Sequence, residues 1–164
     1  MRLLPRTVLI SLAAVLVAAP VASQQPDSQI SPKSLELLKQ GEAHLAAGRF
    51  IEADDSLETA LAVDPRNRAA FISLAKVAQR QKLFGQAIRF TNKALALEPN
   101  DVTAIALQGE AMMGLGAVAR AKGNLGRLQK LCPNGCAQVT ELSAAISRGP
   151  AVAAANPPAT PKSN

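Results

Sequence analysis

Three prolines divide the middle of the chain at equal distances. Pro65, Pro99 and Pro133 lie 34 residues apart. The same step relates three further sets of positions: Gly41, Ala75 and Gly109; Ala53, Ala87 and Ala121; and Phe50, Phe84 and Val118. A fixed period of about 20 to 50 residues indicates stacked copies of one supersecondary unit. The sequence therefore predicts three consecutive units, at 34–67, 68–101 and 102–135.

Each unit has the apolar spacing of two helices. In the first unit, steps of three, four or seven residues relate Leu35, Leu38 and Leu45, and then Leu57 and Leu61. Gly48 and Gly116 interrupt the helical pattern midway through their units, and Gly85 does so slightly later in the second unit. Each repeated proline is expected to end a second helix, because proline has no N–H group and clashes with the preceding turn. We predict an all-α solenoid of three helix-turn-helix units.

The composition agrees with closely packed helices. Hydrophobic residues make up 48% of the chain, yet Trp and Tyr are absent and there are four Phe. Small apolar side chains of this kind suit helices better than a β-sandwich. The small residues that recur every 34 positions are expected to let the two helices of each unit approach closely.

The repeated pattern resembles the tetratricopeptide repeat, a 34-residue unit that reads W-x2-L-G-x2-Y, then A-x3-F, then P. At these positions the first unit has Leu37, Gln40, Gly41, His44, Ala53, Leu57 and Pro65. The second has Phe71, Leu74, Ala75, Ala78, Ala87, Thr91 and Pro99, and the third has Ile105, Gln108, Gly109, Met112, Ala121, Leu125 and Pro133. The resemblance covers 102 of the 164 residues and implies stacked, antiparallel helix pairs.

Two features depart from that pattern. Thr91 stands where the second unit should have a large apolar residue, and Phe90 precedes it. Gly123 and Gly126 fall inside the second helix of the third unit, where each costs about 0.5–1 kcal/mol relative to Ala. We therefore expect this helix to be the least regular of the six.

The segment after the third unit has the features of a cap. A solenoid needs a terminal element to cover the apolar face of its last repeat. In 136–147, Val139, Leu142 and Ile146 lie three and four residues apart, with polar residues on the other faces. This pattern predicts a seventh, C-terminal capping helix, which completes a repeat domain at 34–147. The Pro- and Ala-rich segment 148–164 is predicted to be a disordered tail.

The chain begins with the features of a signal peptide at 1–23. Arg2 and Arg6 precede an apolar run at 8–19. As a helix, this run would reach about 18 Å, against about 30 Å of bilayer hydrocarbon. A basic start, a short apolar run and small residues at its end are typical of a secretory signal, with cleavage before Gln24.

We therefore predict an exported protein, located in the bacterial periplasm and without stable membrane insertion after cleavage. The alternative is tethering by an uncleaved N-terminal anchor. A polar leader follows at 24–33, where Ser31 and Pro32 suit the N-cap and the first position of a helix.

The charge balance argues against a nucleic-acid partner. The formal net charge is +6, from 18 basic and 12 acidic residues, and removal of Arg2 and Arg6 leaves 16 basic residues. No two basic residues are adjacent, and no Tyr or Trp is available to stack on bases. A nucleic-acid interface normally has a dense basic patch with such aromatic residues.

The two cysteines, Cys132 and Cys136, are predicted to form a structural disulfide. A thioredoxin-like redox motif has two intervening residues rather than three, and a c-type haem site needs a His where Ala137 stands. A structural zinc site needs four ligands, which two cysteines and the distant His44 do not supply. A turn after Pro133 can bring the cysteines together. A reactive redox pair and free thiols remain the alternatives.

No residue set in the sequence indicates catalysis, a metal or a cofactor. His44 is the single histidine and occupies a position where the repeat family packs Tyr between helices. A lone His without a matching nucleophile or carboxylate is no catalytic constellation. We therefore expect the protein not to be an enzyme.

The resemblance implies that a partner protein or peptide binds in a concave groove lined by the first helix of each unit. Carried over by repeat position, the groove would contain Leu38, Glu42, Leu45, Ile72, Lys76, Gln79, Arg80, Thr103, Glu110 and Met113. Some members of the family hold a terminal carboxylate with a Lys/Asn/Arg clamp. Leu38 and Glu42 stand where that clamp needs Lys and Asn, so we do not predict it here.

These features together predict an exported adaptor or scaffold that recognises a partner protein or peptide. Two alternatives stay open. One is a thiol–disulfide redox protein that uses Cys132 and Cys136. The other is a non-catalytic subunit of an enzyme complex of the cell envelope.

Overall fold

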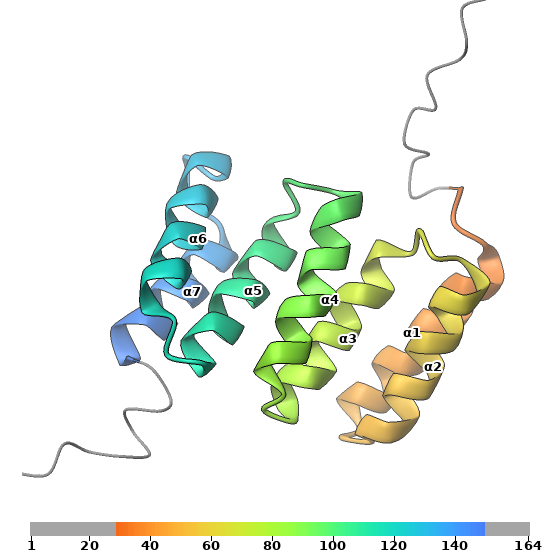
Figure 1. Cartoon of the computed structure of the whole chain (residues 1–164). Helices are drawn as coiled ribbons and strands as arrows, with labels where there is room; N and C mark the ends of the chain where they lie inside the picture. The colour runs from red at the N-terminus through yellow and green to blue at the C-terminus, as the bar shows by residue number, and fades with distance from the viewer. Residues whose placement is uncertain (1–28, 150–164) are drawn as a thin grey trace, which may run out of the picture.

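The computed structural model describes residues 29–149, which fold into seven α-helices without a strand in that range (Figure 1). The helices are α1 (Pro32–Ala46), α2 (Phe50–Val63), α3 (Arg68–Arg80), α4 (Phe84–Leu97), α5 (Val102–Gly114), α6 (Val118–Leu131) and α7 (Ala137–Arg148). The all-α prediction is confirmed. The predicted signal peptide at 1–23, residues 24–28 of the leader and residues 150–164 of the tail lie outside the described residues.

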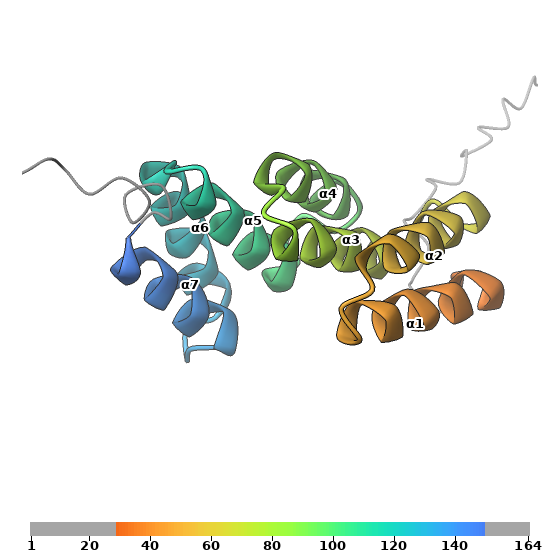
Figure 2. The same ribbon diagram turned by 90° about the horizontal axis from the view of Figure 1, so that it is seen from below.

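The helices form two rows (Figure 2). We call α1, α3, α5 and α7 the inner row, because α1 contacts α3, α3 contacts α5 and α5 contacts α7. The outer row consists of α2, α4 and α6, and among the described residues each outer helix contacts only inner helices. The core is therefore a chain of small clusters between successive helices, as expected for a solenoid.

Small residues let the helices approach closely. Ala53, Ala87 and Ala121, one in each outer helix, are fully buried. A Cβ atom added to Gly41 of α1 would lie 2.5 Å from Cγ of Leu57 in α2. Real Cβ contacts are longer than this, so a side chain at residue 41 would push α1 and α2 apart.

The turn inside each unit requires a left-handed backbone. Gly48 and Gly116 have φ of +73°, and Lys82, at the equivalent position of the second unit, has φ of +60°. Gly85 does not break the helical run as predicted, since it lies in the first turn of α4. The expectation was wrong because the second unit places a lysine where the other two have glycine. L-residues pay a steric penalty for this conformation, and glycine does not.

Side-chain caps start two of the inner helices. The side chain of Asn67 accepts a hydrogen bond from Ala70 N at 3.2 Å, and that of Asp101 accepts one from Ala104 N at 2.8 Å. Ser31 is the N-cap residue of α1, with Pro32 as the first helical residue, but its side chain makes no capping hydrogen bond. Its backbone N–H instead donates to Asp64 at 2.9 Å.

Helix α6 is more regular than expected. Despite Gly123 and Gly126 it is one unbroken helix of 14 residues, the same length as α2 and α4. Its buried residues, Ala121 and Leu128, pack in clusters with residues of α5 and α7. This packing offsets the low helix propensity of the two glycines.

Candidate functional site

The predicted binding residues lie on three of the four inner helices. From α1 come Leu38 and Leu45, which are half-buried against the core cluster that contains Leu57. Glu42, also on α1, is exposed, and one of its carboxylate oxygens accepts a hydrogen bond from the Ser73 hydroxyl of α3 at 2.9 Å. The carboxylate of Glu42 is therefore held on the inner side, at the junction of α1 and α3.

Helix α3 supplies the cations of this surface. Lys76 and Arg80 are both exposed and lie four residues apart, so they stand one above the other on one side of the helix. Helix α3 contains no carboxylate. In the helices that contact α3 within the inner row, Glu42 belongs to α1 and Glu110 to α5.

Gln79 joins two inner helices. Its side-chain amide donates to the carbonyl of Leu107 at 2.8 Å and lies 3.5 Å from a carboxylate oxygen of Glu110. Thr103, the other polar residue predicted on α5, is half-buried near the start of that helix. Gln79 therefore ties α3 to α5, and its hydrogen-bonding capacity is largely used inside the protein.

Burial raises the pKa of Glu110 above its ordinary value, and the nearby carboxylate of Glu141 acts in the same direction. The hydrogen bond from Gln79 and the charge of Arg148 act against this rise. Glu141 and Arg148 belong to α7, so charges on α7 affect the pKa of Glu110 on α5. A cation on a bound partner would relieve the repulsion between the two carboxylates.

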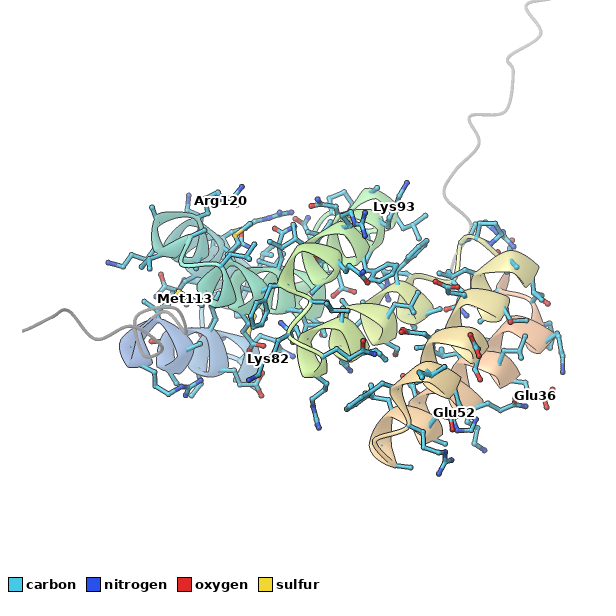
Figure 3. The ribbon with its side chains drawn as sticks, turned by 60° about the horizontal axis from the view of Figure 1, so that its bottom comes forward. Glu36, Glu52, Lys82, Lys93, Met113 and Arg120 are labelled. Atoms are coloured by element: carbon cyan, nitrogen blue, oxygen red, sulfur yellow. A yellow bond between two sulfur atoms is a disulfide. The ribbon has the colours of Figure 1, made fainter. Side chains whose placement is uncertain are left out.

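Two predicted apolar contacts are not available to a partner. Ile72 is 8% exposed and packs with Ala94 and Ala104, and Met113 is 4% exposed. Met113 packs in a cluster with Ala121 and Ile146, because α7 lies against α5 (Figure 3). These two assignments were wrong, since the neighbouring helix covers the side chain in each case.

Helix α7 contributes two exposed charges that the sequence-based assignment missed, Glu141 and Arg148. A signal for Arg148 was present, because it lies 68 residues after Arg80 and so continues the 34-residue register beyond the third unit. The sequence pattern assigns α7 the role of a cap, and a cap is not expected to continue the binding positions of the repeats.

The two cysteines lie at the junction of α6 and α7. Cys132 follows the last residue of α6, Cys136 precedes the first residue of α7, and their sulfur atoms are paired with a Cα–Cα distance of 5.9 Å. Gly135, with φ of +83°, allows the tight turn between them. The Cα–Cα distance is compatible with a disulfide, and the oxidised state stays a prediction.

Three further observations on the described residues concern metal binding, the environment of His44 and membrane spans. Residues 29–149 contain no group of three or more His, Cys, Asp or Glu side chains placed to hold a metal ion. His44 is half-buried, and its Nδ1 atom lies within hydrogen-bonding distance of the Arg49 guanidinium, at 2.9 and 3.1 Å. None of the described helices is both long and apolar enough to cross a membrane.

Comparison with known proteins agrees with the repeat architecture. A family model of the tetratricopeptide repeat matches residues 44–110. The first such domain of Spaghetti (RPAP3), solved with an HSP90 peptide, SRMEEVD, is 29% identical with a TM-score of 0.64, over 71% of this chain and 91% of that chain. The first domain of human RPAP3 is 26% identical, with a TM-score of 0.63, over 71% and 94%.

A third similar structure, the Sgt2 domain from Aspergillus fumigatus, shares the fold. It has a TM-score of 0.67 at 21% identity, over 82% of this chain and 88% of that chain. No curated protein matches this chain in sequence.

Proposed function

Because this chain is a tetratricopeptide repeat protein, we propose that it is an adaptor which binds a partner protein or peptide on the inner row. The observation that carries this proposal is the pair of exposed cations on α3, Lys76 and Arg80, between the carboxylates of Glu42 and Glu110. The surface offers alternating charges and no constellation of catalytic groups. Recognition is therefore its function, rather than catalysis.

The similar domain of Spaghetti was solved with SRMEEVD, a peptide that contains three acidic residues. An acidic stretch of a partner fits the two cations of α3 in this chain as well, because charge-assisted hydrogen bonds are the stronger ones. This resemblance supports a peptide or an extended protein segment as the ligand.

The mode of binding differs from a terminal-carboxylate clamp. Glu42, fixed by the hydroxyl of Ser73, would repel a carboxylate end, and Leu38 has no hydrogen-bond donor to offer it. The proposed ligand is therefore an internal segment, with acidic residues over Lys76 and Arg80 and cationic or amide side chains near Glu42 and Glu110. Three repeats offer a short surface, so the affinity of one site is low.

The place of action is the exported compartment, the bacterial periplasm. The basic start and short apolar run of 1–23 support export, and a disulfide between Cys132 and Cys136 would be stable there. Each of the two alternative functions, a redox protein and a subunit of an enzyme complex, differs from the proposed adaptor in one respect. A redox protein would exchange its disulfide, and a subunit of an envelope enzyme complex would bind a catalytic partner through the same surface.

The test starts with crosslinking and pull-down from the exported compartment to identify a partner. The variant Lys76→Glu/Arg80→Glu is then compared with Arg89→Glu/Lys93→Glu, which makes the same change of charge at two exposed positions, also four residues apart, on α4 of the outer row. We expect the first variant to lose capture and the second to keep it, with both unchanged in circular dichroism. Equal capture by the wild type and the α3 variant would show that the inner row is not the binding surface.

A further inference from the structure

Charges on the outer row are segregated by helix. Helix α2 has four carboxylates and no cation, and we call these residues the acidic pole: Glu52, Asp54, Asp55 and Glu58. Helices α4 and α6 have no carboxylate. Their cations form the basic pole: Arg89 and Lys93 on α4, and Arg120, Lys122, Arg127 and Lys130 on α6.

The segregation follows the repeat register. Glu52, Gln86 and Arg120 occupy the same position in the three units, so the charge there changes from negative through neutral to positive. Asp54 and Lys122 are a second pair with opposite charges at one repeat position. Figure 3 shows Lys93 and Arg120 projecting from the outer row, with Glu52 at the other end of the molecule. The outer row is therefore electrically polarised from one end of the solenoid to the other.

The two poles do not meet within one molecule. Among the seven described helices, α2 contacts only α1 and α3, and α6 contacts only α5 and α7. Within residues 29–149, none of the ion pairs joins α2 to α4 or α6. The acidic pole has a single ion pair, Arg49 with Glu52 at 3.9 Å, and both side chains are about half exposed. Exposed pairs of this kind contribute little. Asp54 and Arg127 are half-buried, and Arg127 donates to the carbonyl of Pro99. The residues available to a partner are the exposed ones: Glu52, Asp55 and Glu58 on α2, and Arg120, Lys122 and Lys130 on α6.

The middle of α6 is open to a second helix. Gly123 and Gly126 lie inside this helix, and a Cβ atom added at either would meet nothing within 4 Å. No packing within residues 29–149 therefore explains these glycines, although each costs helix stability. The two missing side chains, at residues 123 and 126, lower the surface of α6 locally and give another helix room to approach.

Exposed apolar residues accompany the charges on both helices. Ile51, the second residue of α2, is 75% exposed, and Leu131, the last residue of α6, is 37% exposed. Both helices have 14 residues. In an antiparallel pairing shifted by one residue from full overlap, Ile51 lies opposite Leu131 and Glu52 opposite Lys130. The charges and the apolar residues are therefore matched in one register.

We propose that copies of this protein associate head to tail, with the acidic pole on α2 of one copy against α6 of the next. The occupant of each pole is thus a second copy of the same chain, whose charge is complementary. Because the two contacting surfaces differ, the interface is heterologous and extends into rows rather than closing in a symmetric pair. One helix-on-helix contact is small, so the association is weak and sensitive to salt.

This arrangement does not use the inner row. A row of copies would present several inner surfaces side by side, and a partner with repeated segments would then bind with higher avidity than one copy allows. The proposal does not depend on the function proposed above, because it concerns the opposite side of the solenoid.

The test uses the natively processed protein in sedimentation velocity over a range of concentrations, at low and at high salt. Two variants reverse one pole each: Asp55→Lys/Glu58→Lys on α2 and Arg120→Glu/Lys130→Glu on α6. We expect the wild type to associate reversibly at low salt, and each variant alone to associate more than about tenfold more weakly, because reversing two of its four charges leaves the altered helix without net charge. A mixture of the two variants should form pairs again, since the unaltered α6 of the first variant then meets the unaltered α2 of the second.

A control variant, Glu36→Lys/Glu141→Lys, reverses two exposed carboxylates on inner helices and should associate like the wild type. A wild type that stays monomeric at low salt, or variants that fail to associate when mixed, would overturn the proposal. A monomer whose basic pole instead binds vesicles of anionic phospholipid, with loss of binding in the α6 variant alone, would also overturn it.

Discussion

Gly109 of α5 lies directly beneath Leu142 of α7: a Cβ atom at residue 109 would be 2.6 Å from Cδ2 of Leu142, which is fully buried. Leu142 also packs with Ile105 and Leu128. Leu142 of the cap therefore occupies the space that a side chain at residue 109 of the last repeat would need. This close contact holds α7 against α5.

Gly109→Ala should therefore lower the free energy of unfolding by about 1 kcal/mol, because overpacking outweighs the better helix propensity of Ala. Urea denaturation measures the change. Gly123→Ala is the matched control within a helix, since a Cβ atom there meets nothing, and it should raise stability by about 0.5–1 kcal/mol. Equal effects of the two substitutions would contradict the close contact.

Lys82 offers a second test. It has φ of +60° where Gly48 and Gly116 have +73°. Lys82→Gly should raise the free energy of unfolding by about 0.5–1 kcal/mol, because glycine adopts this conformation without the steric cost of a side chain. Gly116→Ala should have the opposite sign and cost about 1–2 kcal/mol. Thermal and urea unfolding of the two variants check the signs, and a destabilised Lys82→Gly would refute this explanation of the turn.

Asp64 should make the stability depend on pH. Hydrogen bonds from the Arg66 side chain and from the backbone of Ser31 lower its pKa from 3.8 to about 2. The folded pKa is lower than the unfolded one, so the stabilisation is complete above about pH 4 and is lost as the pH falls toward 2. Asp64→Asn should flatten the dependence of unfolding free energy on pH between these values. A variant with the same slope as the wild type would contradict this assignment.

The cysteine pair predicts a measurable contribution to stability. The variant Cys132→Ser/Cys136→Ser should unfold about 2 kcal/mol more easily if the pair is a disulfide, according to the chain-entropy model for so short a loop. Alkylation of the native exported protein should label neither cysteine before reduction. A structural bridge should also be hard to reduce, whereas a readily exchanging one would favour the redox alternative. Labelling of both thiols without reductant would exclude the bridge.

The fold could be predicted because its determinants are local and repeated. Three in-phase prolines and the recurring small residues identify helix pairs without any knowledge of distant contacts. The turn of the second unit was misplaced because Lys82 occupies a left-handed position that normally indicates glycine. Gly85, three residues later, was mistaken for the signal.

The exposure of the residues on the proposed binding surface was less predictable. Lys76 and Arg80 are exposed as expected, since charged side chains avoid burial. Apolar side chains at comparable positions were not distinguishable by sequence, and Ile72 and Met113 proved to be buried. Their exposure depends on neighbouring helices, whose positions a repeat pattern alone does not specify.

The sequence by itself determined the period, the helix pairs and the order of charges along the chain, because these follow from local residue preferences. Only the tertiary structure decided how far each residue at one repeat position is buried. Leu45, Gln79 and Met113 occupy the same position in the three units, yet Leu45 is half-buried, Gln79 binds α5 and Met113 lies in the core beside α7. The physical reason is that a solenoid buries each unit against its neighbour, and the neighbour differs at every step.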